Sequence, residues 1–226
     1  MNLSSLEKKI GFVFKNKEFL KEALTHRSYL NENPGWGKNN ERLEFLGDAV
    51  LELITSEFLF KTYPDQPEGQ LTVFRAALIN YQILAKVARE IDLGKYLLFS
   101  KGEAQDLGKA RETILADALE ALLAAIYLDQ GYKSSQTFVK KFLLPHLEEI
   151  LEKKLFRDAK SVLQEVVQEK FKLTPTYQVL EESGPAHQRV FRVGVYFGDK
   201  LKAEGEGSSK QEAEIDAASR ALDFLE

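Results

Sequence analysis

Two segments, well separated in the chain, carry acidic side chains where a helix does not favour them. The second, residues 114–123, lies in a stretch from Thr113 to Leu128 whose only charged residues are Asp117 and Glu120. Such an apolar stretch predicts a buried helix, and carboxylates at i and i+3 project from one face. Buried carboxylates are costly unless a basic group or a metal ion compensates them. This segment alone leaves an ion pair and a metal site equally open.

The first segment, residues 40–51, adds a second acidic face. At about 100° per residue, one stripe holds Glu41, Glu44, Asp48 and Glu52. The opposite face, which we expect to pack in the core, holds Leu43, Leu46, Val50, Leu53 and Ile54. Like-charge i,i+4 pairs cost a helix about 0.2–0.5 kcal/mol each, and no basic residue interleaves the stripe. An acidic stripe is usually a solvated face, and the helix dipole explains acids in the first turn, but neither Asp48 nor Glu52 lies in that turn.

Together the two segments predict a site for a hard cation. Mg²⁺ takes carboxylate oxygens, keeps several waters and is often completed by substrate phosphates. Such an ion would lower the pKa of a bound water and neutralise charge on a phosphate. The chain has no Cys and three His, which disfavours zinc, and neither acidic segment carries the His of a di-iron site. Mg²⁺ or Mn²⁺ with phosphate chemistry is therefore favoured.

The elements that must position these acids change in type near residue 155. Up to Ile150 the periodicity is helical, with breaks at 33–37, 63–69 and 106–108, and a charged linker follows. From Ala159 the pattern is a helix, three strands of which the second alternates at 191–197, and a helix opened by a capping-box spacing at 209–212. We expect an all-α domain at 1–150, a linker at 151–158 and a small α+β domain of order αβββα at 159–226.

Composition sets few further limits. The 226 residues are 44% hydrophobic, which is ample for a core. No apolar stretch reaches the length of ~18 residues that a membrane span needs, and the N-terminus shows no signal-peptide pattern. The absence of Cys suits a reducing cytoplasm. The net charge of −4 does not by itself point to nucleic acid.

Residues 40–51 resemble the signature of the ribonuclease III family of double-stranded-RNA endonucleases, and residues 114–121 match its second acidic element. Shorter matches lie at 23–29 and 128–132, and their order fits a bacterial member over essentially the whole chain. The resemblance implies an all-α nuclease domain followed by a double-stranded-RNA-binding domain. It also implies cytoplasmic cleavage of double-stranded RNA in rRNA and mRNA processing. Mg²⁺ would be the cofactor, with Mn²⁺ as a substitute, and the products would carry 5′-phosphate and 3′-hydroxyl ends.

The same resemblance assigns roles to six acids. The metal ligands would be Glu44, Asp48, Asp117 and Glu120, and the catalytic pair Asp48 and Glu120. Glu41 and Glu68 also match acidic positions of the family, and we expect them to support the structure or contact substrate or subunit. Cutting both strands needs two sites, which a two-fold homodimer through the nuclease domain would supply. Phe45 and Leu46 are candidates for its interface because they flank the signature.

Residues 205–214, after the αβββα pattern, resemble a double-stranded-RNA-binding domain, a module that recognises A-form shape through 2′-hydroxyl and phosphate contacts. The resemblance implies RNA contacts from Ser161, Gln164, Glu165, His187 and Lys210. Lys210 would meet phosphates at a helix N-terminus, which favours them. Residues 159–226 nevertheless contain nine basic and twelve acidic side chains, which is unusual for such a module. We therefore expect few phosphate contacts and a shallow salt dependence of binding.

Two other functions fit parts of the pattern. One is a non-catalytic protein that binds double-stranded RNA in RNA processing or translational control; the presence of all four central carboxylates argues against it. The other is a helical carboxylate metalloprotein, with an appended interaction domain, that acts on a small phosphorylated substrate. Phosphohydrolase activity without RNA affinity would favour that second function.

Overall fold

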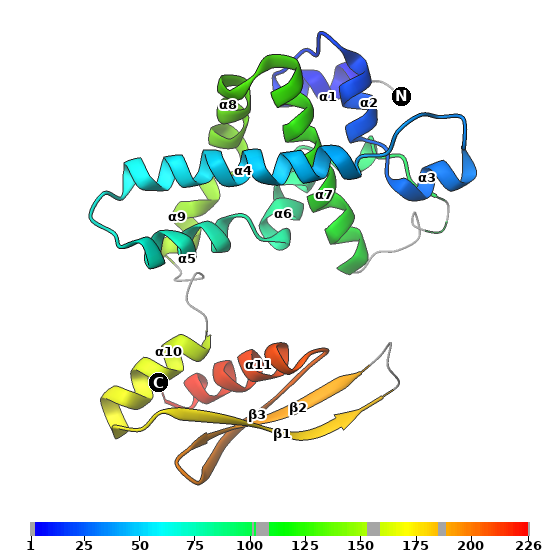
Figure 1. The fold of residues 1–226 in the computed structure, drawn as a ribbon. Helices are drawn as coiled ribbons and strands as arrows, with labels where there is room; N and C mark the ends of the chain where they lie inside the picture. Colours follow the sequence, from blue (N-terminus) through cyan, green and yellow to red (C-terminus); the bar gives the residue numbers. More distant parts are fainter. Residues whose placement is uncertain (1–2, 101, 103–108, 153–158, 185–188, 226) are drawn as a thin grey trace. The chain divides into compact units, whose positions relative to one another are not determined.

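The chain forms two compact units, Met1–Phe156 and Arg157–Glu226, each described by itself (Figure 1). This computed structural model describes residues 3–100, 102, 109–152, 159–184 and 189–225. Residues 153–158 of the expected linker lie outside those ranges, and its first two residues end a helix. No helix in the described ranges is both long and apolar enough to cross a membrane.

The first unit is helical, as predicted. Its helices are α1 (Leu3–Ile10), α2 (Lys17–Ala23), α3 (Arg27–Glu32), α4 (Glu41–Thr62), α5 (Glu68–Leu78), α6 (Tyr81–Glu90), α7 (Lys109–Gln130), α8 (Tyr132–Phe142) and α9 (Pro145–Glu152), with the 3₁₀ turn η1 (Leu93–Lys95). The single extended pairing found among the described residues outside the named strands is an isolated bridge between Thr25 and Leu98. The chain breaks expected at 33–37 and 63–69 separate α3 from α4 and α4 from α5.

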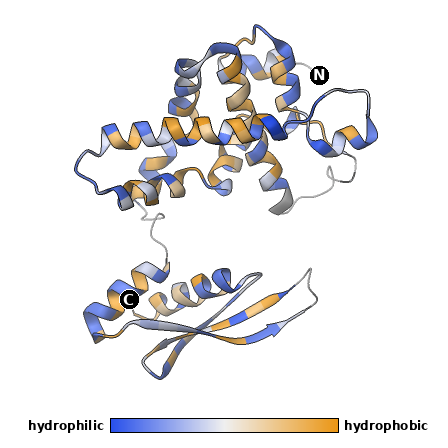
Figure 2. Cartoon of the chain, viewed as in Figure 1, coloured by the Kyte–Doolittle hydropathy of each residue, from blue (hydrophilic) through white to orange (hydrophobic). Residues whose placement is uncertain are grey.

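Helix α7 is the centre of the first unit, and α2, α4, α6 and α8 pack against it. Its residues from Ala121 to Ile126 are almost fully buried. This burial on every side explains why the helix is apolar around most of its circumference. Figure 2 shows hydrophobic residues recurring along the helices of this unit. Asp117 and Glu120 are the half-buried exceptions on this helix between Ile114 and Ile126.

Helix α4 lies across α7 and buries only one side. Leu43, Val50 and Ile54 are buried as predicted. Leu53, expected in the core, is 58% exposed. A rotation of about 100° around the helix separates it from the next residue, Ile54, which is enough to turn its side chain out of the contact with α7.

The two long helices cross at Gly47 with their backbones in contact. A Cβ atom built on Gly47 would lie 1.9 Å from the carbonyl oxygen of Glu120. No side chain fits there, so the glycine in the acidic signature is required by packing. Because Gly47 lies between Glu44 and Asp48 and its contact is Glu120 itself, the crossing brings the two acidic segments together.

The second unit has the predicted αβββα order: α10 (Ala159–Phe171), β1 (Pro175–Ser183), β2 (Val190–Phe197), β3 (Lys200–Gly207) and α11 (Lys210–Asp223). The sheet is antiparallel in the order β1-β2-β3, with Val195 opposite Ala203. The alternating residues of β2 are buried as predicted, and α10 and α11 complete the core with Leu163, Val167 and Ala217.

Helix α11 starts with a modified capping box. Ser209 is the N-cap, and its Oγ accepts a hydrogen bond from the Glu212 amide at 3.2 Å. The Glu212 carboxylate accepts from the amide of Ser208, at 3.0 Å, rather than from that of Ser209. The helix also lies directly on β3, because a Cβ on Gly205 would be 2.1 Å from the Ala217 amide nitrogen.

The Gly47 crossing can be tested by a single methyl group. We expect Gly47→Ala to reduce the free energy of unfolding by about 3 kcal/mol or more, since backbone atoms cannot move aside as a side chain can. Urea denaturation of both variants would measure this. The matched control is Gly69→Ala in α5, where an added Cβ meets nothing within 4 Å. That control should be neutral or slightly stabilising, by about 0.5–1 kcal/mol, and an equal loss in both variants would contradict the packing argument.

Candidate active site

The α4–α7 crossing brings together four carboxylates. Glu44 and Asp48 come from α4 and lie on either side of Gly47, while Asp117 and Glu120 come from α7. They are close enough that the charges of Asp48, Asp117 and Glu44 all act on Glu120. The structure therefore brings together the four residues that the family resemblance assigned to one metal site.

Burial raises the pKa values of three of these acids, and neighbouring negative charge adds to the rise at Glu120 and Glu44. Burial, and then the charges of Asp48, Asp117 and Glu44, raise the pKa of Glu120 to about 8. Burial raises the pKa of Asp117. Burial and the charge of Asp117 raise the pKa of Glu44, against a smaller lowering by Arg27. At neutral pH the Glu120 carboxyl is held in its neutral form unless positive charge is supplied to the cluster.

Within the part of the chain that the structure describes, the charge of Arg27 offsets only part of the rise in the pKa of Glu44. None of the four carboxylates forms an ion pair there, and Arg27 pairs with Glu41 instead, at 3.5 Å. The ion-pair alternative that the sequence left open thus finds no partner in the described ranges. Buried acids without a basic partner are typical of sites that bind a cation.

The donor set fits a hard divalent cation in its chemistry, because every donor is a carboxylate oxygen. As the side chains lie, however, no three His, Cys, Asp or Glu residues of the described part converge closely enough to hold a metal ion. The Asp48 side chain is exposed and the other three are half-buried, so they have room to turn. Side-chain rotation toward a common point would be part of binding.

A cleft opens beside the cluster, with a volume of about 640 Å³. Its lining comprises His26, Arg27, Asn40, Glu41, Glu44, Thr113, Ile114 and Asp117. Glu44 and Asp117 are therefore accessible from it. Five of these lining residues were not among the predicted site residues: His26, Arg27, Asn40, Thr113 and Ile114. The motif match at 23–29 contained the first two.

The start of α3 is held in place at the edge of this cleft. His26 is the N-cap, and its Nδ1 accepts a hydrogen bond from the Ser28 amide. The next residue, Arg27, is exposed and pairs with Glu41. Glu41 also accepts a hydrogen bond from the Asn39 side chain, at 2.9 Å. Glu41 thus lies in the cleft wall, where its carboxylate can orient the guanidinium of Arg27.

Glu68 lies elsewhere. It begins α5, past the other end of α4, and its carboxylate accepts a hydrogen bond from Thr72 at 3.1 Å. It lines a separate groove with Leu53, Phe60 and Arg75. The structure therefore does not bring Glu68 to the four central carboxylates within one chain.

The predicted RNA-contacting residues of the second unit lie on its surface. Ser161, Gln164 and Glu165 are exposed on α10, and their i, i+3 and i+4 spacing places them on one face. Lys210 is exposed at the first residue of α11, with its ammonium 5.9 Å from the centre of the Phe191 ring. His187 lies outside the described residues.

Many basic side chains of this second unit are already paired with its own acids. The ion pairs are Arg189–Glu182, Arg192–Glu181, Arg192–Glu204, Lys160–Glu214 and Arg220–Asp216. Lys210 has no ion pair within the part of the unit that is described. The free positive charge of the unit is thus smaller than its sequence count suggests.

Comparisons with known proteins agree with both units. A family model described as Ribonuclease-III-like matches residues 16–147, and one described as Double-stranded RNA binding motif matches residues 159–225. The chain is 47% identical over 222 residues to Ribonuclease 3 of Desulforamulus reducens, covering 98% of this chain and 90% of that protein. It is 44% identical over 227 residues to Ribonuclease 3 of Dehalococcoides mccartyi, covering 100% of this chain and 96% of that protein.

Solved structures give the same result for the first unit. Two solved structures of the nuclease domain of ribonuclease III from Campylobacter jejuni match with a TM-score of 0.58 and 41% identity. Each covers 64% of this chain, and the match spans 99% and 95% of the respective chains. One of them is described as having structural flexibility in the region involved in dimer formation.

The raised pKa of Glu120 predicts a pH dependence of stability without metal. Between its unfolded value near 4.5 and its folded value of about 8, the folded state holds a proton that the unfolded state has released. The free energy of unfolding should therefore fall as pH rises through this interval. Glu120→Gln removes the titrating group, so the free energy of unfolding of this variant should fall less as the pH rises. Near the upper end of the pH interval the variant should be more stable than the wild type.

Urea denaturation in EDTA, from about pH 5 to about pH 9, would measure both slopes. Glu52→Gln is the matched control, because Glu52 is exposed on the same stripe of α4 and should keep the wild-type slope. If Glu120→Gln lost stability as steeply as the wild type, Glu120 would not be the group responsible.

Proposed function

Because the chain belongs to the ribonuclease III family and is an endoribonuclease with a double-stranded-RNA-binding domain, we propose that it cleaves double-stranded RNA in a Mg²⁺-dependent reaction. Mn²⁺ would substitute, since it shares the preference for oxygen ligands. The observation that carries the proposal is the meeting of four carboxylates, beside an open cleft, at the Gly47 crossing. We place its substrates among rRNA and mRNA precursors in the cytoplasm.

Glu44, Asp48, Asp117 and Glu120 are the residues that would hold the cation, with Asp48 and Glu120 as the essential pair. When bound there, Mg²⁺ supplies charge neutralisation for a phosphate and lowers the pKa of a water. The chain's own part is positioning: α4 and α7 are locked in backbone contact, so the acids cannot drift apart. Arg27, beside the cleft and oriented by Glu41, is available to a phosphate of the approaching strand.

The reaction is hydrolysis of a phosphodiester. The oxygen of a water molecule bonds to phosphorus, the bond from phosphorus to O3′ breaks, and a proton passes to O3′. The products are a 5′-phosphate and a 3′-hydroxyl. No covalent enzyme intermediate is required.

The second unit would hold the duplex by shape. The exposed face of α10 that carries Ser161, Gln164 and Glu165 suits a minor groove, where 2′-hydroxyl groups donate and accept hydrogen bonds. Lys210, at the N-terminus of α11, suits the phosphates across the adjoining major groove. His187 belongs to the same proposal as a contact to the next minor groove.

A homodimer through the first unit would provide two sites for two strands. Along α4, Phe45, Leu53 and Phe60 are 82%, 58% and 72% exposed, and their spacing keeps them within about 80° of one another around the helix. This apolar stripe adjoins the stripe of Glu44 and Asp48. A two-fold contact along it would place the two acidic clusters on the same side of the dimer.

Loss of a central carboxylate should abolish cleavage while leaving duplex binding intact. We expect Asp48→Asn and Glu120→Gln to cut a long RNA duplex about a thousandfold more slowly than the wild type, which corresponds to about 4 kcal/mol. Denaturing gels in Mg²⁺ and in EDTA would follow cleavage, and a mobility shift would follow binding. Glu52→Gln should cleave normally. Retarded but uncut duplex for the wild type in Mg²⁺ would indicate a binding protein without nuclease activity.

Charge on the apolar stripe should dissociate the dimer. Phe45→Glu is expected to convert the protein to a monomer in sedimentation-velocity experiments, since a carboxylate cannot be buried in an apolar contact without compensation. Phe224→Glu is the matched control, because Phe224 is 79% exposed at the end of α11. A wild-type monomer, or a Phe45→Glu dimer, would contradict this interface.

A further inference from the structure

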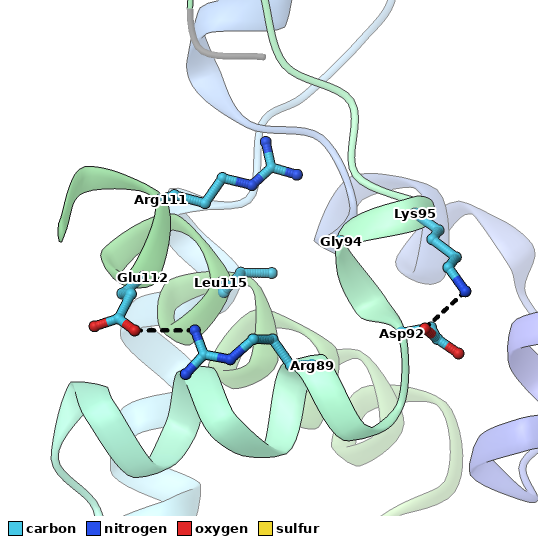
Figure 3. Close-up of a pocket in the computed structure, with 7 residues that line it drawn as sticks. All are labelled: Arg89, Asp92, Gly94, Lys95, Arg111, Glu112 and Leu115. Carbon is cyan, nitrogen blue, oxygen red and sulfur yellow. Dashed lines mark hydrogen bonds and ion pairs between the residues drawn. The ribbon is translucent and has the colours of Figure 1, made fainter. Parts of the chain in front are cut away.

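A second cleft lies on the other side of the start of α7, between α6 and η1, and the function above makes no use of it (Figure 3). Its volume is about 580 Å³, within the range of small-molecule sites. Three basic side chains from three different elements line it: Arg89 of α6, Lys95 of η1 and Arg111 of α7. Two acids, Asp92 and Glu112, line the same cleft.

Arg111 is the side chain that points to a ligand. Among the described residues it has no carboxylate partner, and its guanidinium lies over the ring of Phe99, 4.8 Å from the ring centre. This contact with the ring leaves the N–H groups of the guanidinium available to an anion. Arg111 is also in the first turn of α7, where a cation opposes the helix dipole. An anion in the cleft would relieve that conflict.

The cleft is kept open beneath this arginine. A Cβ atom on Gly94 would lie 3.7 Å from Nη2 of Arg111 and 3.3 Å from a methyl group of Leu115. Figure 3 shows Arg111 extending across the cleft toward the Gly94 turn, with Leu115 below it. A side chain at position 94 would fill the space that the guanidinium faces.

The other two basic residues are held by one carboxylate each and keep donors to spare. Arg89 Nη1 donates to Glu112 at 3.0 Å, which leaves its other N–H groups. Lys95 pairs with Asp92 at 2.7 Å, and Lys9 also donates to Asp92. These two lysines hold the pKa of Asp92 at about 2, so its charge is permanent at neutral pH. Four cations against two carboxylates leave a local excess of positive charge.

We propose that this cleft binds a phosphate group, with the Arg111 guanidinium as its bidentate donor and Lys95 and Arg89 as flanking cations. Arginine's planar fork matches two oxygens of a phosphate, and the nearby amide groups at the start of α7 favour the same anion. The ion pairs Arg89–Glu112 and Lys95–Asp92 fix the two walls. The site is distinct from the carboxylate cluster and would not require a metal ion.

Two sources offer this chemistry. One is a backbone phosphate of the RNA duplex, because Arg111 precedes Asp117 by six residues and thus by about 9 Å along α7; this source rests on the proposed function. The other is a free phosphate compound, for which the cleft would be an independent regulatory site. The experiment separates these sources from each other and from a failure of the nuclease proposal.

The first arm uses inorganic pyrophosphate in metal-free buffer containing EDTA, so that no metal at the acidic cluster can recruit it. Isothermal titration calorimetry on the full-length protein should show pyrophosphate binding that Arg111→Gln weakens about tenfold or more, as expected for a charge-assisted hydrogen-bonded pair. The pyrophosphate affinity of Arg111→Lys should lie between those of the wild type and Arg111→Gln, because lysine keeps the positive charge but loses the planar bidentate donor. Arg220→Gln, in the other unit, removes the same charge and should bind as the wild type does.

The second arm measures duplex binding by the uncleaving Asp48→Asn protein with and without Arg111→Gln, at several salt concentrations. Weaker binding, with the salt slope reduced by about 1, identifies the RNA backbone as the source. Unchanged duplex binding together with lost pyrophosphate binding identifies a free phosphate compound. If Arg111→Gln changes neither, the proposal is wrong. If the wild-type protein cuts no RNA but Arg111→Gln still loses pyrophosphate binding, the nuclease proposal is wrong and the phosphate-site proposal stands.

Discussion

The backbone contact between α4 and α7 is the constraint on which the first unit depends. A hydrogen atom is the largest group that fits at Gly47, and the carbonyl it meets belongs to Glu120. Gly47 therefore lies between two of the charged residues in sequence, Glu44 and Asp48, and touches the backbone of a third. Stability from packing along both helices opposes the repulsion among Glu44, Asp48, Asp117 and Glu120, and it holds the four acids together in the absence of a cation.

That arrangement explains why the acids could be grouped from the sequence. Asp117 and Glu120 stand in a helix that is buried on nearly every side, and the first segment supplies acids that the helix dipole does not explain. The two acidic segments lie together at the α4–α7 crossing. Residue type and spacing in each segment therefore carried information about the same group of acids. The two-unit organisation and the αβββα order were also predictable, because the hydrophobic period changes from helical to alternating.

Other features depend on contacts that no local pattern records. Leu53 has the spacing of a core residue but lies outside the α4–α7 contact, since the direction of approach of α7 decides which side of α4 is covered. Glu68 has the residue type of the cluster but starts a helix past the other end of α4. The Arg111 cleft joins three elements that are separate in sequence, and only their folding together creates it.

The internal ion pairs of the second unit have a consequence for selectivity. Each of Arg189, Arg192, Lys160 and Arg220 already has a carboxylate in place, so an incoming anion must displace an intramolecular competitor at an effective concentration set by the fold. A single phosphate that displaces one of these carboxylates gains little binding free energy, because one ion pair only replaces another. A rigid polyanion that engages several positions at once gains avidity, and the unit would thus discriminate by valency rather than by charge alone.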